Sequence, residues 1–254
     1  RTPLLFNSTA SRPMMWIHIS HSGGSTICRM AKDSEEKVVS PDHNCNWAGV
    51  DDRNLQGEGP VHATCKERKA YFSRHGFTWG AIERDFNAQD YCPHDFDYGI
   101  MLRDPFALAH SQFAFPRLKH NYFDWMAKIE SGSQDPHSMP KMWRVLDNYV
   151  TRFLGGNETY WLPSGKVTKE HAQAAIDLLS KFQVVVLTEA LEDESLKILN
   201  EHRGWGVEAA PKAGSRVHSD RTSCSFSSDE KALIKKHNKW DFMIYDHFKS
   251  KVLR

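Results

Sequence analysis

Hydrophobic positions divide this chain into short apolar runs and longer stretches in which apolar residues recur at helical spacing. Residues 14–19, 96–102 and 182–187 are short, mostly apolar and bounded by polar or turn-forming residues, which is typical of strands buried on both faces. A further strand is predicted over residues 70–79, where it runs into a turn and is followed by residues 81–86. Strands that alternate with helices predict an α/β domain with a parallel sheet.

Helix boundaries are predicted from capping and terminating residues. Pro105 suits a first helical position, Thr168 is a capping residue, and Gly155 follows a helix end. Ser227 and Glu230 have the spacing of a capping box in front of a lysine-rich helix. The predicted helices cover residues 106–113, 141–154, 168–179 and 194–202, the basic stretch 231–239, and about 240–252.

One domain is expected to account for most of the chain. A length of 254 residues allows one sizeable core. Residues 1–13 are polar and resemble a tail or stem remnant, and residues 14–254 are predicted to form a single domain with a loop-rich insert at about 32–68. No apolar run approaches the roughly 18 residues of a membrane helix. Because the sequence begins at Arg1, we expect that an upstream signal or anchor has been removed.

Charge and short motifs bear on partners and compartment. The chain has 33 Lys and Arg against 32 Asp and Glu, so its net charge gives no reason to expect a nucleic-acid partner. Two N-x-[ST] sequons, at Asn7 and Asn157, fit a protein of the secretory pathway.

The five cysteines leave the pairing open. In an oxidising compartment we expect a disulfide between Cys45 and Cys65, which share the polar insert, and a buried free thiol at Cys28. A zinc site formed by these two insert cysteines with His43 and His62 is an alternative, but their spacing matches no tight pair of chelating dipeptides. We therefore expect no metal.

The most informative stretch is residues 14–29, which reads as a buried strand, a glycine-containing turn and the first turn of a helix. Gly23 and Gly24 allow a sharp turn and close approach of a ligand to the backbone. Ser25 and Thr26 favour a helix start, whose amide groups form an anion-binding site. An ordinary strand-to-helix turn is the alternative. The chain lacks both the Gly-Lys-[ST] of nucleoside-triphosphate loops and the G-x-G-x-x-G of dinucleotide folds.

This stretch resembles the 5′-phosphosulfate loop of sulfotransferases, H-I-P-K-T-G-G-T-S, over residues 18–26. Ser20 replaces the proline of that pattern, and His21 replaces its lysine. The resemblance implies a P-loop-like, three-layer α/β fold with a central parallel sheet flanked by helices. It also implies nucleotide contacts from the loop residues His21, Ser22, Gly23, Gly24, Ser25 and Thr26.

A second motif, residues 99–111, resembles the 3′-phosphate motif of the same enzymes. Its strand ends in L-R-D-P, and Arg103 and Ser111 match the arginine and the serine that hold the phosphate. A local ion pair between Arg103 and Asp104 is the alternative. Residues 148–154, 185–196 and 241–246 resemble further pieces of membrane-bound carbohydrate sulfotransferases, particularly the heparan sulfate 2-O and 6-O enzymes.

From this resemblance we expect Arg152, in the first of these three pieces, to contact the nucleotide or the acceptor, whereas core packing is the simpler interpretation of Tyr245 in the last. The implied donor is 3′-phosphoadenosine 5′-phosphosulfate, and the implied acceptor is a hydroxyl group, most simply on a sugar or glycan. The same likeness implies the Golgi lumen and a membrane-anchored type II protein.

Three residues are candidates for the chemistry of transfer. In the related enzymes a His or Glu near the end of the second strand removes the acceptor proton, so His75 is the first candidate base and Glu83 the second. His21 is the candidate cation on the bridging oxygen. Because imidazole has an ordinary pKa near 6.5, activity is then expected to fall as the pH rises above neutrality.

Three other functions stay open at this point. One alternative is a sulfotransferase that acts on a small-molecule metabolite. The loss of the loop lysine at His21 suits a non-catalytic nucleotide- or glycan-binding module. A P-loop nucleotide kinase is disfavoured by the missing Gly-Lys pair.

Overall fold

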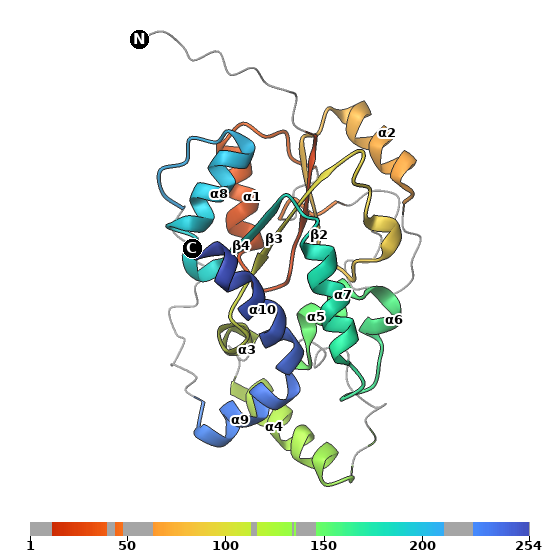
Figure 1. Cartoon of the computed structure of the whole chain (residues 1–254), viewed down its shortest axis with the longest axis vertical. Helices are drawn as coiled ribbons and strands as arrows, with labels where there is room; N and C mark the ends of the chain where they lie inside the picture. Colours follow the sequence, from red (N-terminus) through yellow and green to blue (C-terminus); the bar gives the residue numbers. More distant parts are fainter. Residues whose placement is uncertain are drawn as a thin grey trace.

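A computed structural model describes residues 12–39, 44–47, 63–112, 116–133, 135, 146–210 and 226–253. Its centre is a parallel sheet of four strands in the order β2-β1-β3-β4 (Figure 1). The strands are β1 (Met14–Ile17), β2 (Trp79–Ile82), β3 (Asp97–Leu102) and β4 (Val184–Leu187). The predicted α/β class with a parallel sheet flanked by helices is confirmed.

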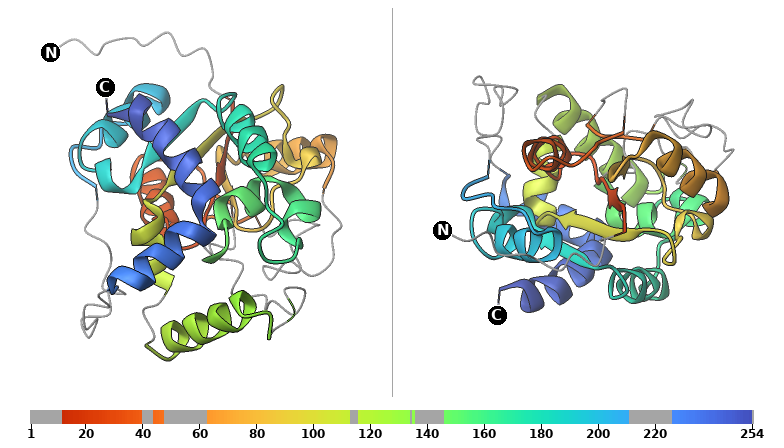
Figure 2. Two further views of the ribbon diagram at one scale, coloured as in Figure 1. Left: turned by 60° about the horizontal axis from the view of Figure 1, so that its bottom comes forward. Right: turned by 90° about the horizontal axis from the view of Figure 1, so that it is seen from above.

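Alternate residues of each strand enter two different cores, because successive side chains point to opposite faces of a sheet. Met14 and Trp16 pack with α1 (Gly24–Asp33) and α8 (Glu194–Arg203). Met15 and Ile17 belong to the larger core on the other face. That core is completed by residues of α5 (Tyr149–Leu154), α7 (Lys169–Leu179) and α10 (Lys239–Val252). The view from above shows the sheet between these helical layers (Figure 2).

The remaining helices extend the domain beyond the sheet. A smaller core joins α3 (Pro105–Gln112), α4 (Pro116–Glu130) and α9 (Ser228–His237) through residues such as Ala109, Trp125 and Ile234. These helices lie together toward the lower end of the molecule in Figure 1. Also described are the helices α2 (Cys65–His75) and α6 (Gly156–Tyr160) and the 3₁₀ turns η1 (Ala88–Asp90) and η4 (Thr188–Ala190).

The prediction of a strand over residues 70–79 is wrong, because most of this segment belongs to the helix α2 (Cys65–His75). A capping box of Thr64 and Glu67 starts α2, and Gly76, with φ of 65°, ends it in the left-handed conformation. The neighbouring aromatic residues Tyr71 and Phe72, which favour a strand by their composition, are successive residues of this helix, and Phe72 is buried. The second strand therefore begins only at Trp79.

The helix predicted over residues 141–154 is shorter within the described chain. Its helical part begins at Tyr149, because Asn148 has a φ of 54° that breaks the helical path, and residues 141–145 lie outside the described residues. Gly155 ends α5 as predicted, and the short α6 follows at once. The prediction gave no helix for residues 116–130, where the structure has α4.

The predicted cysteine pairing is also wrong. Cys28 pairs with Cys45, and Cys65 pairs with Cys92. Cys45 and Cys65 are thus in different disulfides, so they cannot form the alternative zinc site as free thiolates; His43 and His62 lie outside the described residues. The error follows from the strand predicted over residues 70–79. In the structure Cys65 lies in the first turn of α2, which places it beside Cys92 in the turn before β3.

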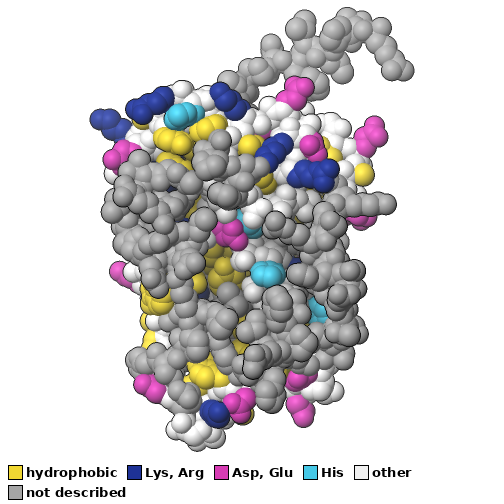
Figure 3. Space-filling view, turned by 180° about the vertical axis from the view of Figure 1, so that it is seen from behind, with side chains coloured by type: hydrophobic (Ala, Val, Ile, Leu, Met, Phe, Trp, Pro, Cys, Tyr) yellow, Lys and Arg dark blue, Asp and Glu magenta, His cyan; other side chains and the backbone are white. Residues whose placement is uncertain are grey.

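Seen from behind, the described surface carries side chains of both charges, with lysine and arginine gathered toward its upper end (Figure 3). Among the described helices, none has the length and apolar character needed to span a bilayer.

The strand order identifies where a ligand is expected. The chain passes from β1 outward to β2, and then returns across β1 to place β3 on its other side. In open parallel sheets, ligands bind at the carboxyl ends of the strands where the connections diverge in this way. In this sheet that point lies between the carboxyl ends of β1 and β3.

Candidate functional site

The loop after β1 has the geometry of an anion cradle. Gly23 caps α1 in the left-handed conformation, with φ of 77°, and a Cβ added there would come within 2.9 Å of Met101 Sδ. Ser22 is 2% exposed, and its Oγ has no hydrogen-bond partner among the described residues. Within the described part of the chain, no side chain caps α1. The first amides of α1 and the buried hydroxyl therefore provide donors at the positive end of a helix dipole.

His18 lies under this loop. It is the first residue after β1, is 4% exposed, and its ring packs directly on Gly24. A Cβ on Gly24 would lie 1.9 Å from His18 Nε2, so only glycine leaves room for the ring. On its other side, His18 Nδ1 lies 3.2 Å from Glu83 Oε2. His18 therefore connects the glycine loop to a carboxylate on the neighbouring strand.

Glu83 directly follows β2, at the same edge of the sheet as the loop. Its Oε2 also accepts a hydrogen bond of 2.7 Å from Asn46 Nδ2. Burial opposes ionisation of the Glu83 carboxyl, but the nearby His18 ring, with its charge, and hydrogen bonds from Asn46 and Ser20 outweigh burial and lower its pKa. Glu83 is thus an ionised, partly exposed carboxylate at the carboxyl end of the sheet, placed to accept a proton.

Asn46 belongs to a short segment that the sequence left unassigned. Trp47 N donates to Ala81 O at 2.7 Å, so the segment pairs with the outer edge of β2. The preceding Cys45 is joined to Cys28 in α1. Asn46 is 3% exposed, and its Oδ1 has no partner among the described residues. Neither His18 nor Asn46 was singled out from the sequence. His18 was detectable as the first polar residue after the strand, whereas Asn46 is brought in only by the tertiary pairing.

The arginine motif meets the glycine loop at His21. Arg103 follows β3 directly, and its Nη1 donates to His21 O at 2.6 Å. His21 Nδ1 lies 3.0 Å from the Oγ of Ser111, a buried residue of α3. These contacts hold His21 at a φ of 63°, a conformation that histidine tolerates better than most residues. The structure therefore brings together the two motifs, which are more than eighty residues apart in sequence.

Asp104, the residue after Arg103, caps the helix that follows it. Its Oδ1 accepts from the amides of Phe106 and Ala107, which makes it the cap of α3. The Asp104 amide donates to Glu189 Oε1 at 2.9 Å, and Tyr245 OH donates to Glu189 Oε2 at 3.2 Å. Glu189 and Tyr245, from two of the weaker sequence motifs, thus fix the turn that carries Arg103. The interpretation of Tyr245 as a core residue agrees with its 4% exposure.

Arg152 does not have the predicted role. Its side chain is fully buried, and Nε and Nη2 donate to the backbone oxygen and the carboxylate of Asp147 at 2.6 and 2.9 Å. Nη1 donates to carbonyl oxygens that include Leu162 O at 2.7 Å. A guanidinium with its donors used in this way ties the turn after α6 to α5 and is closed to a ligand. The same helix approaches the loop through the buried Tyr149, which hydrogen-bonds to the backbone of Ser20.

His75 does not lie near the end of the second strand, where it was predicted to act as the base. It is the last residue of α2 and precedes β2, so it lies toward the amino end of the sheet, whereas Glu83 follows the carboxyl end. The exposed His75 ring stacks on Phe77 with centroids 5.3 Å apart. Of the two candidate bases, Glu83 is the one that lies at the edge of the sheet that holds the loop.

The two remaining loop residues have local contacts. Ser25 is exposed, and its Oγ donates to Asn44 Oδ1 at 2.8 Å, next to the Cys28–Cys45 disulfide. Thr26 N donates to Gly23 O at 2.9 Å within the first helical turn. Both lie at the helix start, as predicted, and their positions follow from the glycine turn.

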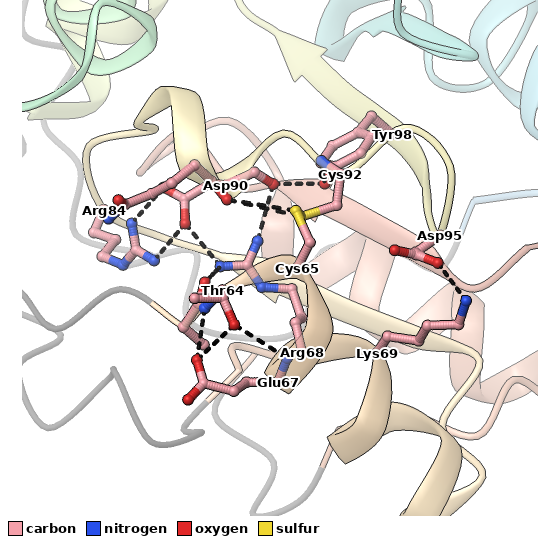
Figure 4. The surroundings of a disulfide bond; sticks show 12 residues. Thr64, Cys65, Glu67, Arg68, Lys69, Arg84, Asp90, Cys92, Asp95 and Tyr98 are labelled. Atoms are coloured by element: carbon pink, nitrogen blue, oxygen red, sulfur yellow. Dashed lines mark hydrogen bonds and ion pairs between the residues drawn. A yellow bond between two sulfur atoms is a disulfide. The ribbon is translucent and has the colours of Figure 1, made fainter.

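A buried ion-pair cluster fixes the chain beyond Glu83. Arg84 and Arg68 both bind the Asp90 carboxylate, with the closest contacts at 2.8 Å (Figure 4). Burial opposes ionisation of Asp90, but the two guanidinium groups and hydrogen bonding lower its pKa. The Cys65–Cys92 disulfide closes the same region from α2 to the turn before β3. The residue after Glu83 is thus held rigidly, which favours a single position for the carboxylate.

Comparison with protein-family models, with curated proteins and with solved structures gave no significant match.

Proposed function

We propose that this protein transfers a sulfuryl group from 3′-phosphoadenosine 5′-phosphosulfate to a hydroxyl acceptor, with a sugar or glycan as the acceptor class. The observation that carries the proposal is the meeting of the glycine loop with Arg103 and Ser111 through His21, beside the Glu83 carboxylate. Two anion-binding groups beside one carboxylate suit a donor with two phosphate positions and an acceptor that must lose a proton.

Each group then has a defined part in the reaction. The amides at the start of α1 and the Ser22 hydroxyl bind the 5′-phosphosulfate, and Arg103 with Ser111 binds the 3′-phosphate. Glu83 takes the proton of the acceptor hydroxyl as its oxygen attacks sulfur in line with the leaving phosphate. His21, between the two groups, supplies positive charge when protonated.

His18 and Asn46 are positioning residues in this scheme. Both contact Glu83 Oε2, which orients the carboxylate toward the acceptor. Removal of one positioned general base typically lowers a rate by about 10²–10⁴-fold. A variant without the Glu83 carboxylate is expected to keep nearly the same nucleotide affinity, because in this scheme the phosphate groups do not contact Glu83.

The test is transfer of radiolabelled sulfate from the donor nucleotide to a panel of desulfated glycosaminoglycans, neutral oligosaccharides and aryl alcohols. Glu83→Gln is compared with Glu201→Gln, an exposed glutamate of α8 with 68% side-chain exposure. The proposal expects transfer by the wild type and by the α8 variant, and a loss of about 10²–10⁴-fold in Glu83→Gln.

Nucleotide binding without transfer to any acceptor would support a non-catalytic binding module instead. Equal transfer by wild type and Glu83→Gln would refute the assignment of the base. Competition by ATP as strong as that of the desulfated donor, measured by thermal shift, would favour a kinase-like nucleotide site.

A further inference from the structure

The sequon at Asn157 lies on the surface of the folded domain. Asn157 is an exposed residue of α6, and the sequon continues through Glu158 to Thr159. Trp161 Nε1 donates to Asn157 Oδ1 at 2.9 Å. This bond fixes the oxygen end of the amide. In the part of the chain that the structure describes, Nδ2, the atom that N-glycosylation modifies, is left without a hydrogen-bond acceptor.

Trp161 itself is unusual for its exposure. It is 38% exposed, and among the described residues Leu253 is the other exposed large hydrophobic side chain. Its indole nitrogen is held by Asn157, so the ring has a fixed orientation next to the modifiable nitrogen. Indole rings pack well on the C–H face of sugars, which buries apolar area while leaving sugar hydroxyls in water. A sugar on Asn157 would cover this exposed ring.

A surface depression adjoins the same asparagine. It has a volume of about 430 Å³, within the range of small-ligand sites. Amide and carboxylate side chains that can bond sugar hydroxyl and acetamido groups lie around it. Its lining residues are Asn87, Ala88, Gln89, Gly155, Gly156, Asn157 and Glu158. None of these residues belongs to the nucleotide site described above.

The disulfides give an independent argument for the compartment. Two disulfides occur among the described residues, Cys28–Cys45 and Cys65–Cys92. Such bonds form and persist in oxidising compartments, where the lipid-linked oligosaccharide donor for N-glycosylation is also found. The enzyme that transfers this oligosaccharide acts on the chain before folding is complete. The burial of Thr159 in the folded protein is therefore no obstacle.

We propose that Asn157 carries an N-linked glycan whose first N-acetylglucosamine packs on Trp161 and extends over the adjoining depression. In the modification, Asn157 Nδ2 attacks the anomeric carbon of a polyisoprenyl-diphosphate oligosaccharide. A carbon–nitrogen bond forms, the bond between the carbon and the diphosphate oxygen breaks, and its electron pair leaves with the lipid diphosphate. The amide nitrogen releases one proton. The inference does not depend on the function proposed above.

The first test is mass mapping of the full chain secreted from a eukaryotic host. The peptide that contains Asn157 is expected to carry the glycan, and peptide-N-glycosidase treatment in heavy-oxygen water should convert that asparagine to labelled aspartate. Asn157→Gln should abolish the modification of this peptide. An unmodified Asn157 in secreted protein whose two disulfides have formed would overturn the proposal.

The second test addresses packing on the indole. Enzymatic removal of the glycan from the folded wild type is expected to lower its melting temperature by about 2–4 °C. In Trp161→Ala, which keeps the sequon, the same treatment should change the melting temperature much less. If removal of the glycan lowered the melting temperature of both proteins equally, the sugar would not pack on Trp161. Whether Asn157 is glycosylated is decided separately by the mass measurement.

Discussion

Gly24 offers the sharpest test of the site geometry, because one added carbon atom would disturb both the loop and the candidate base. The backbone of Gly24 is not in the left-handed region, so alanine is tolerated by the local conformation and would even favour the helix by about 0.5–1 kcal/mol. The added Cβ would, however, lie 1.9, 2.0 and 2.3 Å from three atoms of the His18 ring.

The size of the effect follows from these distances. Cβ contacts in proteins are essentially never closer than 3.0 Å, so the ring must retreat by more than an ångström. His18 is 4% exposed and has Glu83 on its far side at 3.2 Å, which leaves no open space to move into. Overpacking of this kind costs about 1–3 kcal/mol. We therefore expect Gly24→Ala to lower the melting temperature by about 2–4 °C for each kcal/mol.

Thermal unfolding measures this cost, and two comparisons isolate its cause. Gly206→Ala is the matched control, because a Cβ there meets no atom of the described residues within 4 Å, and it should be neutral. In a His18→Ala background the ring is gone, so Gly24→Ala should cost less than it does alone. A neutral Gly24→Ala, or the same cost with and without the His18 ring, would refute the reasoning.

Three further outcomes are expected. His75→Ala should keep near-normal transfer, because His75 lies toward the amino end of the sheet; a large loss in the transfer assay would restore it as the base. Arg152→Met should lower the free energy of unfolding by about 3–5 kcal/mol in denaturant titration, because Asp147 loses its buried partner, while folded protein keeps its nucleotide affinity; a selective loss of affinity would contradict the structural role. Asp90→Asn should destabilise at neutral pH by a similar amount. Because the pKa of Asp90 is lowered in the folded protein, the stability that its carboxylate provides is present above the unfolded pKa and is lost as the pH falls. The difference in unfolding free energy between wild type and Asp90→Asn should therefore narrow below about pH 4. A difference that stays constant down to pH 2 would contradict this.

Strand content was largely predictable because buried parallel strands are nearly continuous apolar runs. Residues 14–19, 96–102 and 182–187 each contain an observed strand. The failure at residues 70–79 has a physical cause, since aromatic residues there suited a strand while the capping box at Thr64 and the left-handed Gly76 impose a helix. Local capping outweighed strand propensity at this point.

The candidate site was predictable only where its residues are adjacent in sequence. The glycine loop and the Arg103 motif were each found from local spacing, and their common location follows from the strand order. Arg152 was misjudged because a sequence shows a charge on an apolar helix but not the carbonyl oxygens that fold around it. Asn46 could not be predicted, because its contact with Glu83 depends on pairing of a short segment with an edge strand.

The most direct measurement is calorimetric titration with two nucleotides, adenosine 3′,5′-bisphosphate and adenosine 5′-monophosphate. If the glycine loop and Arg103 bind opposite ends of one nucleotide, the wild type prefers the bisphosphate, and Arg103→Ala loses about 10- to 100-fold of that preference. The control Arg29→Ala, an exposed arginine of α1, should keep the preference. No heat with either nucleotide, or an unchanged preference in Arg103→Ala, would contradict the account.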